Sequence, residues 1–138
     1  MEKAVFNLQD YRFTNIQLHL ADLENEDTLS LAFNPRGIFE ADKKNFKLIF
    51  DFKALAEKSG VTVVDVTCEA NFQFRDAVSF EEIPLYFYSN SIAILFPYVR
   101  AMVSTLTLQA NMVRPIVLPT MNLTSLQELL RNQVEIRS

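Results

Sequence analysis

The sequence contains little glycine, cysteine and histidine, and no tryptophan. With Gly37 and Gly60 as its two glycines, it lacks the glycine-rich loops that hold nucleotide phosphates. A single cysteine, Cys68, excludes an internal disulfide and agrees with a reducing compartment. The single histidine, His19, has no second histidine and no carboxylate at ligand spacing. We therefore expect no metal ion and no other cofactor.

Long runs of one kind of residue are also missing. Lysine and arginine are scattered, with only Lys43 and Lys44 adjacent, and the formal net charge is −4. No basic stripe is present to neutralise phosphates, so nucleic acid is not an expected partner. No apolar run reaches the length of a membrane span, and the N-terminal residues lack the regions of a signal peptide. These features predict a cytoplasmic protein with one domain over residues 1–138 and no membrane insertion.

Apolar and polar residues alternate in the first half of the chain, and this period of two predicts half-buried strands. The shared faces are Thr14, Ile16, Leu18 and Leu20; then Phe46, Leu48, Phe50, Phe52 and Ala54; then Val64, Val66, Cys68, Ala70, Phe72 and Phe74. A further strand contains the turn-like residues 34–37, and residues 57–60 predict a hairpin. Short connections favour an antiparallel sheet, while the longer acidic segment 22–28 suits a crossover between strands that are not neighbours.

The second half changes to helical spacing. Residues 91–110 predict a helix that either begins at Pro97 or kinks there. Its apolar stripe is wide enough to contact another subunit as well as the sheet. Pro115 and Pro119 then hold the chain extended, and a second helix begins at Asn122 or Ser125. On composition alone, the simplest interpretation of the apolar segment between the helices is a loop that covers the core.

The residues needed for catalysis are missing from the sequence. The serines and Cys68 have no histidine base, and Cys68 falls on an apolar strand face, where a buried and inert thiol is expected. Asp65 and Glu69 share the polar face of one strand, as an ordinary solvated face would have them. We expect the protein not to be an enzyme.

One run of residues resembles a known family. Leu95, Phe96, Pro97, Tyr98 and Arg100 are similar to the opening of the first helix in the SecB protein-export chaperones. Later positions follow the family pattern less closely: Pro115, Val117, Leu118, Pro119 and Asn122, with Leu123 and Leu126 in the next helix. The resemblance implies an α+β fold in which a four-stranded antiparallel sheet is followed by two helices packed on one face. It also implies a homotetramer, built as a dimer of dimers, whose interface would include Tyr98, Met102 and Leu106.

The implied function is that of an ATP-independent holdase, which binds unfolded precursor proteins and keeps them competent for export. The implied client groove is lined by Leu23, Met112, Ile116, Leu118, Met121 and Leu123. Family members dock the translocase motor SecA through acidic residues. Here Glu69 is retained, but Asn15 and His19 stand where acidic residues are usual.

Two alternatives follow from these departures and from the sequence itself. The first is a dedicated SecB-like chaperone of a single partner, such as the antitoxin of a toxin–antitoxin pair. The second is a structural or ligand-binding domain that is not a chaperone and whose apolar loop only covers the core.

Overall fold

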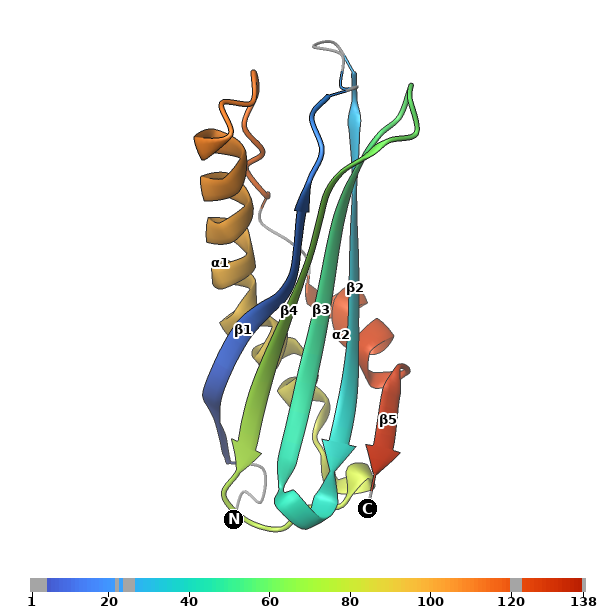
Figure 1. Ribbon diagram of the computed structural model, residues 1–138. Coiled ribbons are helices and arrows are strands. Elements are labelled where there is room, and N and C mark those ends of the chain that lie inside the picture. Colours follow the sequence, from blue (N-terminus) through green and yellow to red (C-terminus); the bar gives the residue numbers. More distant parts are fainter. Residues whose placement is uncertain (1–4, 22, 24–26, 120–122, 138) are drawn as a thin grey trace.

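The computed structural model describes residues 5–21, 23, 27–119 and 123–137. It is one five-stranded sheet with two helices on a single face (Figure 1). The strands are β1 (Phe6–Leu18), β2 (Leu29–Glu40), β3 (Asn45–Ala56), β4 (Thr62–Phe74) and β5 (Val134–Arg137), in the spatial order β1-β4-β3-β2-β5. The predicted α+β class is confirmed, but the predicted count of four strands is wrong. The additional strand, β5, is short and runs parallel to β2 at the edge of the sheet.

Antiparallel pairing joins the four long strands, as the short connections predicted. The hairpin between β3 and β4 turns through residues 57–61, with Gly60 at a φ of 76°. Glycine adopts this left-handed conformation without a steric penalty. The acidic segment after β1 is a crossover, because β1 and β2 lie on opposite sides of the β4–β3 pair.

Phenylalanine rings line the inner face of the sheet. The side chains of Phe46, Phe50, Phe52, Phe72 and Phe74 are buried there because alternate residues of a strand point to the same side. Helix α1 (Leu85–Gln109) covers this face. Its residue Phe87 meets Phe46 edge to face at 4.8 Å between ring centroids, a favoured geometry for aromatic pairs. The rings therefore couple the helix to the middle strands.

The helix α1 begins at Leu85, so the predicted start at Pro97 is wrong. Pro97 lies inside the helix, and its missing N–H leaves the carbonyl of Ala93 without the usual helical donor. Both residues are on the exposed side of the helix, where this loss is tolerated. The axis of α1 changes direction between its yellow and orange parts (Figure 1), in agreement with the predicted kink.

By length and composition, α1 would be able to cross a membrane, so the prediction that no apolar segment reaches that length is wrong for residues 85–109. Core helices of globular proteins have the same properties. In this structure Ile92, Leu95 and Val99 of α1 are completely buried against the sheet. Packing accounts for the apolar character of this side of the helix.

Helix α2 (Leu123–Arg131) is anchored by Leu126 and Leu130, which are both buried in the core. The predicted start at Ser125 is wrong, because Ser125 lies within the first turn. The alternative cap, Asn122, lies outside the described residues. After α2 the chain turns at once into β5.

Gly37 gives a test of this packing. A Cβ atom added at Gly37 would lie 2.4 Å from Cζ of the buried Phe46 ring. We expect Gly37→Ala to lower the free energy of unfolding by about 1–3 kcal/mol, because the ring has no room to move. Urea unfolding followed by circular dichroism measures the loss. In a Phe46→Leu background the added methyl group meets less of a side chain, so the loss should shrink. An equal loss in both backgrounds would contradict the proposed clash.

Candidate functional site

The segment between the helices, residues 112–118, is here called the connector. Some of its side chains point into the core and others out to solvent, with strict alternation over residues 115–118. Met112 and Ile116 are 8% and 6% exposed and Leu118 is fully buried, whereas Val113 and Val117 are 70% and 66% exposed. The connector therefore contributes three apolar side chains to the core and presents two to the outside.

Helix α1 holds the connector through two hydroxyl groups. The backbone N–H of Ile116 donates to Oγ1 of Thr107 at 3.0 Å, and Oγ of Ser104 donates to the carbonyl of Ile116 at 3.3 Å. Thr107 is fully buried, so the N–H of Ile116 has no access to water as an alternative acceptor. Both backbone groups of Ile116 are thus fixed by the last turns of α1.

This arrangement places several of the predicted client-groove residues toward the core of the protomer. Met112, Ile116 and Leu118 face the core of the protomer, and Leu23 is partly buried against the same core. Met121 and the side chain of Leu123 lie outside the described residues. The exposed apolar residues, Val113 and Val117, were not among the predicted groove residues. For Val117, the extended backbone imposed by Pro115 and Pro119 was a signal, because neighbouring side chains of an extended chain point to opposite sides.

The outer edge of β2 is the second feature of the candidate site. The N–H of Glu57 donates to the carbonyl of Thr28 at 2.9 Å, so even-numbered residues of β2 direct their backbone groups toward β3. Odd-numbered residues direct theirs outward, away from the sheet. Among the described residues, the outward backbone groups of Leu29, Leu31 and Phe33 have no partner strand. Unpaired backbone groups of this kind are a template for another extended chain.

The other half of the same edge is covered. The strand β5 pairs with Gly37–Glu40, and the N–H of Gly37 donates to the carbonyl of Gln133 at 3.0 Å. Nε2 of Gln133 also donates to the carbonyl of Pro35 at 2.8 Å and to Oδ1 of Asn34 at 3.0 Å. Since proline has no N–H, Gln133 completes the hydrogen bonding of the edge at residue 35.

A partly exposed side of α1 that reaches β1 is apolar as well. Tyr98 is 40% exposed and stacks on Tyr11 of β1, with 4.2 Å between ring centroids. Ile94 and Leu108 are exposed on the same helix, whereas the predicted interface residues Met102 and Leu106 are only partly buried. We call Ile94, Tyr98, Leu108 and Tyr11 the apolar α1 face.

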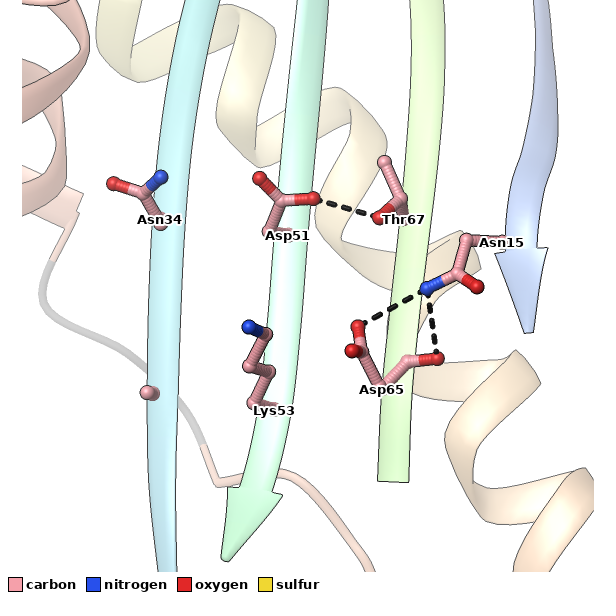
Figure 2. Close-up of a pocket in the computed structure, with 7 residues that line it drawn as sticks. Asn15, Asn34, Asp51, Lys53, Asp65 and Thr67 are labelled. Carbon is pink, nitrogen blue, oxygen red and sulfur yellow. Dashed lines mark hydrogen bonds between the residues drawn. The ribbon is translucent and has the colours of Figure 1, made fainter. Parts of the chain in front are cut away.

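Polar side chains cover the outer face of the sheet, opposite the helices. Figure 2 shows a shallow hollow of about 400 Å³, lined by residues from all four long strands. Nδ2 of Asn15 donates to Oδ1 of Asp65 at 3.1 Å, and Oγ1 of Thr67 donates to Oδ1 of Asp51 at 2.7 Å. Lys53 has no ion pair within the described part of the chain.

The charges of this outer face are largely compensated. Nζ of Lys47 lies 3.5 Å from Oε1 of Glu69, and Nε of Arg36 lies 3.3 Å from Oδ2 of Asp51. The side-chain amide of Asn15 donates to the carboxylate of Asp65. His19 is an exposed residue just after β1, and its backbone N–H donates to the carbonyl of Val63 at 2.8 Å. The three residues predicted for motor docking therefore present no cluster of uncompensated negative charge.

Cys68 is fully buried on the inner face of β4, beside Phe50 in the neighbouring strand. Burial, with a smaller contribution from Glu69, raises the pKa of this thiol to about 12. The thiol is therefore protonated at neutral pH and inaccessible. In the part of the chain that the structure describes, no group of three or more His, Cys, Asp or Glu residues is placed to hold a metal ion.

Thr107 gives a test of how the connector is held. We expect Thr107→Val, which keeps the shape but removes the hydroxyl, to lower the free energy of unfolding by about 1–3 kcal/mol, because the N–H of Ile116 becomes a buried donor without an acceptor. Thr107→Ser keeps the hydroxyl and is the matched control. Urea unfolding gives the stability, and hydrogen exchange at Ile116 reports the local effect. Unchanged exchange in the valine variant would contradict the assignment.

No protein-family model matches the sequence. An uncharacterized protein of Methanocaldococcus jannaschii is 54% identical over 37 residues, which are 27% of this chain and 23% of that protein. The chain thus spans less than a quarter of this relative. A protein of unknown function from Streptococcus agalactiae aligns over 84% of this chain and 94% of its own at 14% identity, with a TM-score of 0.35 that is too low to indicate a shared fold.

The structure has a much higher similarity to that of the SecB-like chaperone Rv1957 of Mycobacterium tuberculosis. That protein was solved in complex with a ChAD peptide from the antitoxin HigA1. The two structures align with a TM-score of 0.67 over 85% of this chain and 88% of the other, at 21% sequence identity. The chain described here therefore has the fold of a SecB-like chaperone.

Proposed function

We propose that the protein is a cytoplasmic, ATP-independent chaperone that holds unfolded segments of other proteins. The observation that carries this proposal is the open edge of β2 at Leu29, Leu31 and Phe33. An extended client can pair its backbone with these groups whatever its sequence, and strand addition is a common mode of peptide recognition. The side chains of the three residues are only partly buried, so they add apolar contact beside the edge.

The connector supplies a second kind of contact. Val113 and Val117 are largely exposed apolar side chains on a segment whose backbone is fixed by α1. Rigid apolar groups bind a flexible client at a lower entropic cost than mobile ones. The predicted groove residues Met112, Ile116 and Leu118 would support this surface from the core, and Leu23, Met121 and Leu123 remain proposed groove residues.

The structural similarity supports a polypeptide as the ligand. The SecB-like chaperone of Mycobacterium tuberculosis was solved with a peptide from an antitoxin. By analogy, clients of this chain would be unfolded proteins, including precursors destined for export.

A dedicated partner is the second candidate function, and the outer face of the sheet favours it over a general role in export. Glu69 is compensated by Lys47, while Asn15 and His19 are not acidic. This surface attracts a basic docking partner less strongly than an acidic surface would. Docking of SecA at Asn15, His19 and Glu69 is therefore the least supported part of the export hypothesis.

We further propose that copies of the chain assemble through the apolar α1 face, as a dimer of dimers. Tyr98 is central to this face, and the partly buried Met102 and Leu106 lie on the same helix. Apolar side chains at this density on one helix and the neighbouring strand are typical of surfaces buried in oligomers. A tetramer would offer several β2 edges to one client and so increase the overall affinity.

The first experiment measures refolding of a slow-folding secretory precursor with and without the protein, in the absence of nucleotide. We expect refolding to stop near one oligomer per client. Leu31→Pro should weaken the effect, because proline removes an outward N–H without breaking a β2–β3 hydrogen bond. Loss of the hydrogen bond from this N–H to the client corresponds to about a fivefold lower affinity.

Leu31→Ala is the matched control, since it shortens the same side chain and keeps the N–H. A larger loss for the proline variant than for the alanine variant identifies backbone pairing as the source of binding. If the wild-type protein does not retard refolding of the precursor, the general holdase is excluded. Binding to a protein encoded beside it would then support the dedicated partner.

The assembly proposal has its own test. Tyr98→Asp places a charge on the apolar α1 face, and we expect it to reduce the oligomer to smaller species, because a buried charge without a partner is strongly unfavourable. Tyr98 is already partly exposed, so the protomer should stay folded. Asn34→Asp adds the same charge on the outer face and should leave the mass unchanged. Light scattering coupled to gel filtration measures the mass of both variants, and an unchanged mass for Tyr98→Asp would overturn the proposed interface.

A further inference from the structure

The edge of β2 already holds one extended segment, namely the chain's own β5. Residues 134–137 pair in parallel with Gly37–Glu40 and lie next to β2 in Figure 1. The covered residues and the open residues Leu29, Leu31 and Phe33 belong to one continuous strand edge. A client that pairs along β2 therefore meets β5 as soon as it extends past Pro35.

The strand β5 is weakly held by comparison with the rest of the sheet. It is four residues long, and its Ile136 side chain is 57% exposed. Arg137 forms an ion pair with Glu135, which is in the same strand and not in β2. The side chain of Val134 is partly buried against the core. This side chain and backbone pairing to four residues of β2 keep β5 in place, and a short edge strand of this kind opens easily.

Release of β5 does not require α2 to unfold. Leu126 and Leu130 anchor α2 in the core, and the N–H of Gln133 donates to the carbonyl of Leu130 at 2.9 Å. The segment that would detach begins immediately after this bond. Gln133 itself contacts Gly37 and Pro35, so it marks the boundary between the covered and the open parts of the edge.

We propose that β5 is an internal competitor for the client site, which a client segment displaces when it pairs with the whole length of β2. This inference rests on the proposed function, because it assumes that clients pair with the β2 edge. With β5 docked, three outward-facing residues of the edge have no partner strand within the described parts of the chain. With β5 released, the carbonyl of Gly37 and both backbone groups of Phe39 become available as well, so β5 restricts binding to client segments long enough to replace it.

The test uses two proline variants of the full chain. In the parallel pairing, Gly37 lies opposite Val134 and donates to Gln133, so Glu135 is the β5 residue whose N–H and carbonyl face β2. Glu135→Pro removes that N–H and should release β5. Ile136→Pro is the matched control, because the N–H at residue 136 points away from β2. Hydrogen exchange at the backbone N–H of Phe39 reports whether β5 has left, since the N–H of Gly37 is bonded to Gln133, which precedes β5.

Affinity is then measured by fluorescence anisotropy with labelled, reduced and carboxymethylated α-lactalbumin, a chain that stays unfolded. We expect Glu135→Pro to speed exchange at Phe39 and to bind this probe about tenfold more tightly, because the apparent dissociation constant falls as the binding-competent fraction rises. Ile136→Pro should match the wild-type protein in both measurements.

The outcomes separate this inference from the function on which it rests. If the wild-type protein binds the probe and Glu135→Pro binds it equally well despite faster exchange, the competition is overturned and the chaperone proposal stands. If neither the wild-type protein nor the variants bind it, the general holdase is overturned together with the competition.

Discussion

Packing of α1 on the phenylalanine-lined inner face of the sheet is the contact on which the rest of the structure depends. The rings of Phe46, Phe72 and Phe74 surround Phe87 of the helix at centroid distances between 4.8 and 5.9 Å. Burial of aromatic side chains of this size is a large stabilising contribution in a chain of 138 residues. Because both helices lie on this face, the other face of the sheet stays in contact with solvent and is polar.

The same one-sided packing leaves the two features on which the proposed function is based. Among the described residues, a sheet with a single helical layer leaves the β2 edge beside α2 only partly covered and the apolar α1 face partly exposed. These two surfaces differ in chemistry. The edge of β2 offers backbone hydrogen bonds to chains of any sequence, while the apolar α1 face offers side-chain contacts that suit one particular partner, which we propose to be a second copy.

Much of this fold was predictable from the sequence. Strict alternation marked β3 and β4, and the residues around Gly60 marked the turn between them. The strand β5 was missed because four residues carry too little pattern to distinguish a strand from a tail. The start of α1 was misplaced because residues 85–90 have no capping side chain to mark it, and Pro84 occupies the cap position. Resemblance to a family gave the architecture, whereas periodicity gave the strands.

The candidate site was less predictable, since its features depend on tertiary contacts. Composition showed that the connector is apolar, but its facing depends on tertiary contacts such as the hydrogen bonds that Ile116 forms with the hydroxyl groups of Ser104 and Thr107. In the same way, the family pattern pointed to Glu69, Asn15 and His19, but their surroundings depend on cross-strand neighbours such as Lys47 and Asp65. Neighbours of this kind follow from strand order, and no short stretch of the sequence predicts strand order.

Pro35 has a consequence for the behaviour of the protein at high concentration. An exposed strand edge without interruption invites copies of a protein to stack edge to edge into insoluble aggregates. Pro35 offers no N–H at the middle of the β2 edge, and Gln133 occupies its carbonyl. A continuous ladder between two copies is broken at this point, so the edge that we propose for unfolded chains is protected from fibril growth.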